Sequence, residues 1–223
     1  MEKIDNIPVD LNLGEIRKRL HLEKREKEWA HAKALVEAVQ PLIKPRAVYK
    51  VSYIESKHDN AVRIEGVRLV SRLLREHLDK AIRAFPYVFT IGGELEKKAR
   101  VSSDLLDQYY LDIIGNAAMT MIRKYFEDRL RSVYGLDTIS YMSPGSLNDW
   151  PIEQQRPLFS ILGDVEASIG VSLNKNFLMI PSKSLSGIYF PTEISFYSCQ
   201  LCPRENCPTR KAPYDKKLAK RYR

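Results

Sequence analysis

The chain has 223 residues, of which 44% are hydrophobic and 29% charged, and its formal net charge is +8. This is the composition of a globular protein, and a chain of this length buries a sizeable core without disulfides or a metal. No apolar run approaches the roughly 20 residues of a membrane span, and the N-terminus lacks a basic region followed by an apolar one, so we expect neither a membrane segment nor a secretory signal.

The positive charge is concentrated at the C-terminal end. Between Arg204 and Arg223, eight Lys and Arg residues face two acids, which gives this segment +6 and leaves +2 for residues 1–203. Such an end is usually solvated, or it contacts an acidic partner surface. Because the body has no comparable basic excess, we do not expect nucleic-acid binding.

The first seventy residues predict helices followed by a hairpin. Apolar residues at three- and four-residue steps predict one or two helices over 15–43, and Pro45 ends that pattern. Alternating side chains then predict a strand over 46–56, a turn at 58–60 and a returning strand over 61–69.

The middle of the chain predicts two helices with a short strand between them. Helical periodicity returns over 70–85, with Ser71 as its N-cap, and a strand follows over 87–93. A broad apolar face then predicts a long helix over 103–134, which Gly135 ends.

The remaining elements are short. We expect a strand and then a loop within 136–151, a helix over 152–163, and strands over 169–173, 177–181 and 186–190. This order of elements predicts a single α+β domain with a twisted, largely antiparallel sheet that packs against long helices, preceded by extra N-terminal helices.

The common catalytic patterns are absent. The sequence contains no glycine-rich phosphate loop, no nucleophile elbow and no HExxH zinc helix, and its four histidines are scattered. We therefore do not expect a self-contained hydrolase, and we assign no catalytic residue.

Two loops stand out by composition. In "SPGS" (143–146), Pro144 fixes the chain and Gly145 lets a ligand approach the backbone closely. In "PSKSLSG" (181–187), three serines, a lysine and a glycine join two predicted strands. By composition alone, both are turns.

A series of short motifs surrounds these loops, and their order and spacing carry more information than any one of them. The motifs are Pro144-Gly145, Leu158-Phe159, Leu162-Gly163, Ile169 to Leu173, Met179 to Pro181, and Ser186 to Phe190. This series resembles the activation, or reactivation, domain of cobalamin-dependent methionine synthase. The resemblance is strongest over residues 140–190.

The resemblance implies a C-shaped α+β domain that binds S-adenosylmethionine. In that family the domain helps to remethylate cobalamin that has fallen into the cob(II)alamin state, with an electron from a reductant and a methyl group from S-adenosylmethionine. It implies that the loop backbone and a strand tyrosine hold the ligand. The candidate binding residues are Tyr141, Ser143, Pro144, Gly145, Lys183, Gly187 and Tyr189.

Two positions depart from the family pattern. An arginine that would pair with the ligand carboxylate is replaced by Tyr141, and Lys183 or Arg123 is the candidate substitute. The acid of the long helix aligns with Thr120 or Lys124. The nearest acids, Glu127 and Asp128, are a turn or more away.

All three cysteines, Cys199, Cys202 and Cys207, lie in "CQLCPRENC" near the C-terminus. An odd number of clustered cysteines indicates reduced thiols in a cytoplasmic protein. Zinc sites and iron–sulfur clusters usually take four ligands, so an iron–sulfur cluster, a zinc ion and redox-active or free thiols all stay open.

We divide the chain into an N-terminal helical segment (1–45), an activation-like domain (46–196) and a basic, cysteine-containing tail (197–223). The resemblance predicts a stand-alone accessory protein that assists reductive methylation of a corrinoid held by a separate methionine synthase core or corrinoid protein. An electron-donor protein is a further candidate partner. Such a protein is one part of a methyltransferase system, not a complete enzyme. The alternative is a non-catalytic binding or metal-sensing module with the same fold and a degenerate S-adenosylmethionine site.

Overall fold

One central strand, β6, organises the sheet of the computed structural model, which describes residues 1–207 and 210–222. The strands of the main sheet are β1 (Glu2–Asp5), β2 (Arg46–Tyr49), β3 (Ser52–His58), β4 (Ala61–Ile64), β5 (Val67–Val70), β6 (Arg83–Thr90), β7 (Ile139–Met142) and β10 (Ser184–Pro191). β10 pairs with one edge of β6, and β2 followed by β3 pairs with the other. β7 extends the sheet beyond β10, β1 extends it beyond β2, and β4 and β5 continue from β3. Each of these pairings is antiparallel, as the sequence predicted.

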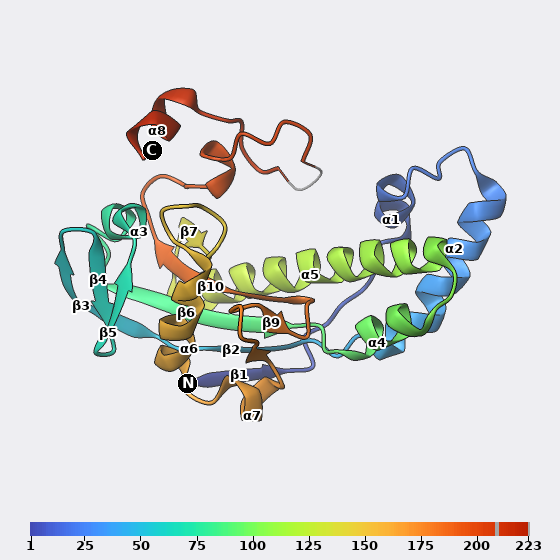
Figure 1. Cartoon of the computed structure of the whole chain (residues 1–223), viewed down its shortest axis with the longest axis horizontal. Helices are drawn as coiled ribbons and strands as arrows, with labels where there is room; N and C mark the ends of the chain where they lie inside the picture. The colour runs from blue at the N-terminus through green and yellow to red at the C-terminus, as the bar shows by residue number, and fades with distance from the viewer. Residues whose placement is uncertain (208–209, 223) are drawn as a thin grey trace.

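Helices cover both faces of this sheet (Figure 1). They are α1 (Leu13–Arg19), α2 (Glu26–Val39), α3 (Arg72–His77), α4 (Glu94–Val101), α5 (Leu105–Tyr134), α6 (Gln155–Leu162), α7 (Val165–Ile169) and α8 (Lys216–Arg221), with 3₁₀ turns η1 (Gln40–Leu42), η2 (Ile152–Gln154) and η3 (Ser198–Gln200). Tyr87 and Phe89 of β6 pack into the cluster that α5 covers, whereas Val88 between them packs with α6 and α7. Successive side chains of β6 thus point to opposite faces of the sheet and belong to two separate apolar layers.

The long helix α5 confirms the prediction over 103–134. The side chain of Asp104 accepts a hydrogen bond from the N–H of Leu106 at 2.8 Å, and Gly135 ends the helix in a left-handed conformation at φ 61°. Ile16 of α1 and Val36 of α2 are buried in the same hydrophobic cluster as α5. The N-terminal helices therefore pack against one end of α5, as Figure 1 shows.

Several predicted elements were wrong in type or extent. The strand predicted over 46–56 is divided into β2 and β3, and the strand predicted over 87–93 is β6, which begins at Arg83. The single strand predicted over 61–69 is two strands, because Glu65 and Gly66 turn the chain with positive φ. The helix predicted over 70–85 ends at His77, because the residues that follow enter β6, where burial between two neighbouring strands outweighs a continued helical pattern.

A further error lies at residues 169–173, where a strand was predicted. Asp164 caps the short helix α7 and Gly170 ends it at φ 72°, so the strand that remains is only β8 (Ser172–Leu173). It pairs with β9 (Met179–Ile180) in a separate two-stranded sheet. β1 and α4 were not predicted; the four residues of β1 are too few to show a period.

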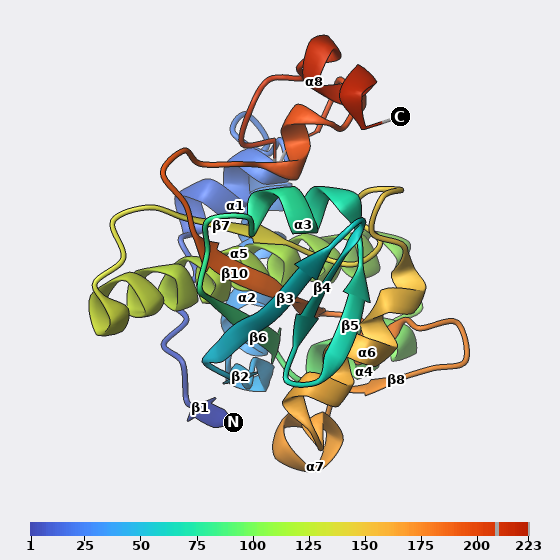
Figure 2. The same ribbon diagram turned by 90° about the vertical axis from the view of Figure 1, so that its left-hand side faces the viewer.

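The tail lies over one end of the sheet. Figures 1 and 2 place α8 above α3 and the β3–β5 strands, near the edge of the sheet that β7 forms. Phe196 is buried, and Leu218 of α8 packs against the same hydrophobic cluster as α3. Among the described residues, no helix is both long and apolar enough to cross a membrane.

Candidate ligand site

The closest approach in the predicted site is between β10 and β7, at Gly187. A Cβ atom there would overlap the carbonyl oxygen of Met142 and would lie 2.8 Å from Ser143 Oγ and 3.0 Å from Tyr87 Oη. Only glycine therefore lets β10 pass the point where β7 ends and the loop 143–146 begins. Burial raises the pKa of Tyr87 far above its usual range, so this phenol stays neutral.

The loop 143–146 is closed by its own hydrogen bonds. Gly145 has a φ of 80°, and its N–H donates to the carbonyl oxygen of Trp150 at 2.7 Å. Ser146 donates to the carbonyl oxygen of Ser143 from both its N–H, at 3.2 Å, and its Oγ, at 2.6 Å. Pro144 is buried whereas Gly145 is exposed. The N–H of Gly145 is therefore engaged by Trp150, four residues after the loop.

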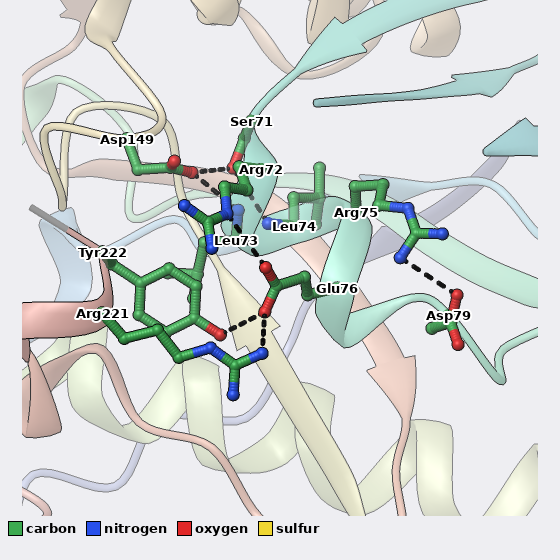
Figure 3. Close-up of polar contacts among 10 residues, drawn as sticks. All are labelled: Ser71, Arg72, Leu73, Leu74, Arg75, Glu76, Asp79, Asp149, Arg221 and Tyr222. Atoms are coloured by element: carbon green, nitrogen blue, oxygen red, sulfur yellow. Dashed lines mark hydrogen bonds and ion pairs between the residues drawn. The ribbon is translucent and has the colours of Figure 1, made fainter. Parts of the chain in front are cut away.

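Asp149, three residues after this loop, binds the chain to α3, as Figure 3 shows. Asp149 Oδ2 accepts hydrogen bonds from Ser71 Oγ and from the N–H of Leu73, the latter at 2.9 Å. Ser71 Oγ in turn accepts from the N–H of Leu74 at 2.9 Å, so it is the N-cap that the sequence predicted. The first turn of α3 thereby holds the loop against the sheet.

Two tyrosines, whose rings are tilted against each other by 50°, lie beside Gly187. Tyr189 of β10 and Tyr141 of β7 are register partners, and their ring centroids are 5.3 Å apart. Tyr189 is fully buried, and Tyr141 is partly exposed. Burial raises the pKa of both phenols, so both hydroxyls stay protonated and can donate hydrogen bonds.

Helix α5 supplies an acid and an arginine to these tyrosines. Tyr189 Oη donates to Glu127 Oε1 at 3.1 Å, and Arg123 Nη1 donates to Tyr141 Oη at 3.1 Å. Arg123 and Glu127 are one turn apart, with Nε and Oε1 separated by 4.0 Å. The side chains of both are only 20% exposed. The four residues form what we call the tyrosine cluster: Arg123, Glu127, Tyr141 and Tyr189.

The tail covers the tyrosine cluster. Lys211 Nζ lies 3.6 Å from Glu127 Oε1, 5.4 Å from the centroid of the Tyr141 ring and 5.7 Å from that of Tyr197. The backbone N–H of Lys211 donates to Cys199 Sγ at 3.4 Å. A cation from the tail therefore occupies the space in front of Tyr141.

Lys183 lies elsewhere. Its Nζ donates to Asp112 Oδ1 at 2.6 Å and to Asn116 Oδ1 at 2.7 Å, both in the first half of α5. Six residues of extended chain separate Lys183 from Tyr189, which corresponds to roughly 20 Å. Lys183 lines a small cavity of about 210 Å³ beside α4. The structure thus brings Tyr141, Ser143, Gly187 and Tyr189 together, but not Lys183.

An arginine holds the cysteine loop together. The guanidinium of Arg210 donates to the carbonyl oxygens of Cys199 at 2.9 Å, Ala212 at 3.0 Å and Cys202 at 3.1 Å. Within residues 1–207 and 210–222, no group of three or more His, Cys, Asp or Glu side chains is arranged to hold a metal ion. The prediction of an iron–sulfur cluster or zinc at Cys199, Cys202 and Cys207 thus gains no support from the described residues.

The structure also has an open groove of about 970 Å³, which no residue of the tyrosine cluster lines. It runs between α3, the start of β6 and the segment 191–196 that leaves β10. Its lining mixes acids, bases and exposed apolar side chains such as Ile194.

Arg123 was predicted as a substitute for the missing arginine, whereas Glu127 was expected to lie a turn or more from the position of the missing helix acid. The i, i+4 spacing of these two residues, next to the buried stripe of Ile122, Phe126 and Leu130, was the signal that both face the sheet. No local pattern pointed to Tyr197 or Lys211, because their place depends on how the tail folds back.

The fold is an α+β domain with a curled antiparallel sheet, a long covering helix and a glycine in β10 where that strand passes β7. Among solved structures, the chain is similar to one described as "Crystal Structure of the MetH Reactivation Domain bound to AdoHcy", with a TM-score of 0.62 over 88% of this chain and 79% of that one, at 16% sequence identity. No family model and no curated protein sequence matches the chain. The likeness confirms the predicted fold.

Proposed function

We propose that this chain binds an S-adenosyl ligand at the tyrosine cluster and assists reductive methylation of a corrinoid on a separate protein. The observation that carries the proposal is that α5 presents Arg123 and Glu127 to the hydroxyls of Tyr141 and Tyr189. The similar fold of a methionine synthase domain whose structure contains AdoHcy supports this reading.

The charges of the cluster match those of an amino-acid ligand. The guanidinium of Arg123 suits the ligand carboxylate, which would take over the role of the arginine that Tyr141 replaces. The carboxylate of Glu127 suits a cationic group of the ligand, and the tyrosine rings suit either a flat base or a cation. These residues bind and orient the ligand.

In this proposal the chain contributes binding and orientation only. S-Adenosylmethionine supplies the methyl group, a separate reductant supplies the electron, and a methionine synthase core or corrinoid protein holds the cobalamin. The exposed, basic tail suits an acidic surface on such a partner.

A second candidate function is a non-catalytic binding module with a degenerate ligand site. Two observations favour it: the N–H of Gly145 is engaged by Trp150, and Lys211 covers Tyr141. The two functions differ in whether the ligand binds and whether a corrinoid is methylated.

A reactivation assay tests the proposed function. The purified chain is added to a corrinoid protein loaded with cob(II)alamin, together with S-adenosylmethionine and a chemical reductant, and methylcobalamin formation is followed by absorbance. We expect the wild-type chain to accelerate methylation and Glu127→Gln to lose most of this effect. Asp128→Asn, which changes the neighbouring exposed acid, is the matched control and is expected to behave as wild type. An equal rate with and without the wild-type chain would contradict the proposed function.

A further inference from the structure

The C-terminal end of the tail is bound to α3 by a group of contacts that we call the latch, as Figure 3 shows. Glu76 Oε2 of α3 accepts hydrogen bonds from Tyr222 Oη at 2.6 Å and from Arg221 Nη2 at 3.1 Å. Arg72 lies over the ring of Tyr222, with 5.7 Å between Cζ and the ring centroid. The apolar side chain of Leu218 packs against the body beside this latch. The tail is therefore docked on the body both here and at the tyrosine cluster.

At the tyrosine cluster, Tyr141, Tyr197 and Glu127 surround the ammonium group of Lys211, and we call these three residues the cage. Tyr141 from β7 and Tyr197 from the tail present their rings to Lys211 Nζ within the roughly 6 Å of a cation–π contact. Glu127 supplies the negative charge at 3.6 Å. The Lys211 side chain is 29% exposed, so the ammonium is only partly hydrated. Two aromatic rings and one carboxylate make a chemical environment that suits an organic cation.

We propose that Tyr141, Tyr197 and Glu127 bind the sulfonium centre of the ligand, and that Lys211 occupies the same place when no ligand is bound. This inference rests on the proposed function, because it concerns the same site. Tyr197 and Lys211 belong to the tail, so the tail takes part in choosing the ligand.

Competition with Lys211 favours a ligand that carries a positive charge. A sulfonium that enters the cage replaces one positive charge with another, so Glu127 keeps a partner. When the methyl group leaves, the sulfur keeps the bonding electron pair and becomes a neutral thioether. A neutral thioether leaves Glu127 with only the more distant Arg123, at 4.0 Å, as its cationic partner, so the return of Lys211 displaces the product. The chain therefore distinguishes S-adenosylmethionine from AdoHcy by charge at this cage.

Calorimetric titration of both ligands into wild type and Lys211→Gln tests the competition. Removing a cation held by two aromatic contacts and one ion pair is expected to raise the affinity for S-adenosylmethionine about tenfold, and that for AdoHcy by less. Lys216→Gln, which changes an exposed lysine of the same tail, is the matched control and is expected to leave both affinities unchanged. An unchanged or lower affinity of Lys211→Gln for S-adenosylmethionine would overturn the inference.

Two further measurements separate the cage from the proposed function. In the wild-type chain without ligand, Lys211 is expected to react several-fold more slowly than Lys216 with an amine-labelling reagent, and equal reactivity would overturn the inference. Trimethylsulfonium, which carries no adenosyl group, is expected to shift the ring resonances of Tyr141 and Tyr197 in Lys211→Gln. Unshifted tyrosine resonances would overturn the cage. Shifted resonances, together with no binding of S-adenosylmethionine to wild type or to Lys211→Gln, would support the cage and refute the proposed function.

Discussion

Gly187→Ala tests the packing that positions the candidate site. The new Cβ would overlap the carbonyl oxygen of Met142 and lie 2.8 Å from Ser143 Oγ and 3.0 Å from Tyr87 Oη. The carbonyl oxygen is backbone, so it cannot rotate away as a side chain would. β7 and β10 must separate by about 1 Å to restore ordinary contact, which strains their ladder of hydrogen bonds.

We expect this substitution to lower the free energy of unfolding by about 3 kcal/mol, the upper part of the range for overpacking a well-packed core. The measurement is urea unfolding of wild type and variant, followed by circular dichroism. The control is Gly93→Ala, because φ there is −97° and the nearest atom to its Cβ is Pro181 Cβ at 3.7 Å, an ordinary contact. If Gly187→Ala loses no more stability than Gly93→Ala, the close approach of β10 to β7 is refuted.

Further predictions concern the contacts of α3 and a turn of the 143–146 loop. Burial alone would raise the pKa of Glu76, but the hydrogen bonds and charges of its three partners lower it, so Glu76→Gln is expected to cost about 1 kcal/mol. Because the pKa of Glu76 is lower in the folded than in the unfolded chain, the stability difference between wild type and Glu76→Gln is fully present above about pH 4.3 and shrinks as the pH falls through the folded pKa. Urea unfolding of both proteins at several pH values checks this, and a stability difference that does not change with pH would contradict it. Asp149→Asn is expected to lower the free energy of unfolding by about 1 kcal/mol through the first turn of α3, and a thermal melt identical to wild type would count against that contact. Gly145→Ala is expected to lower the free energy of unfolding in urea more than Gly66→Ala. Both glycines have positive φ, but a Cβ at Gly145 would lie 2.7 Å from an isoleucine side chain, whereas a Cβ at Gly66 would meet open space. Equal losses of stability would argue against the packing of the 143–146 loop.

The long helix and the β7–β10 region could be predicted because their signals are local. Thirty residues of consistent periodicity between Asp104 and Gly135 leave little room for another structure. The order and spacing of the motifs around Gly145 and Gly187 indicated the fold, although each motif alone is short.

Other parts could not be predicted because they depend on distant contacts. Residues 70–85 have a helical apolar pattern, yet Phe85 belongs to a strand because β2, β3 and β10 flank β6. The place of Glu127 follows from the rotation of α5 against the sheet. Lys211 reaches Tyr141 only because the tail folds back over β7, about seventy residues away in sequence, and no local pattern encodes that path.

Calorimetric titration of S-adenosylmethionine into the whole chain tests ligand binding at the tyrosine cluster most directly. We expect one binding site per chain, and an affinity at least about tenfold lower for Arg123→Gln, which removes the guanidinium beside Tyr141. No binding to wild type, or binding that Arg123→Gln leaves unchanged, would contradict a ligand site at this cluster.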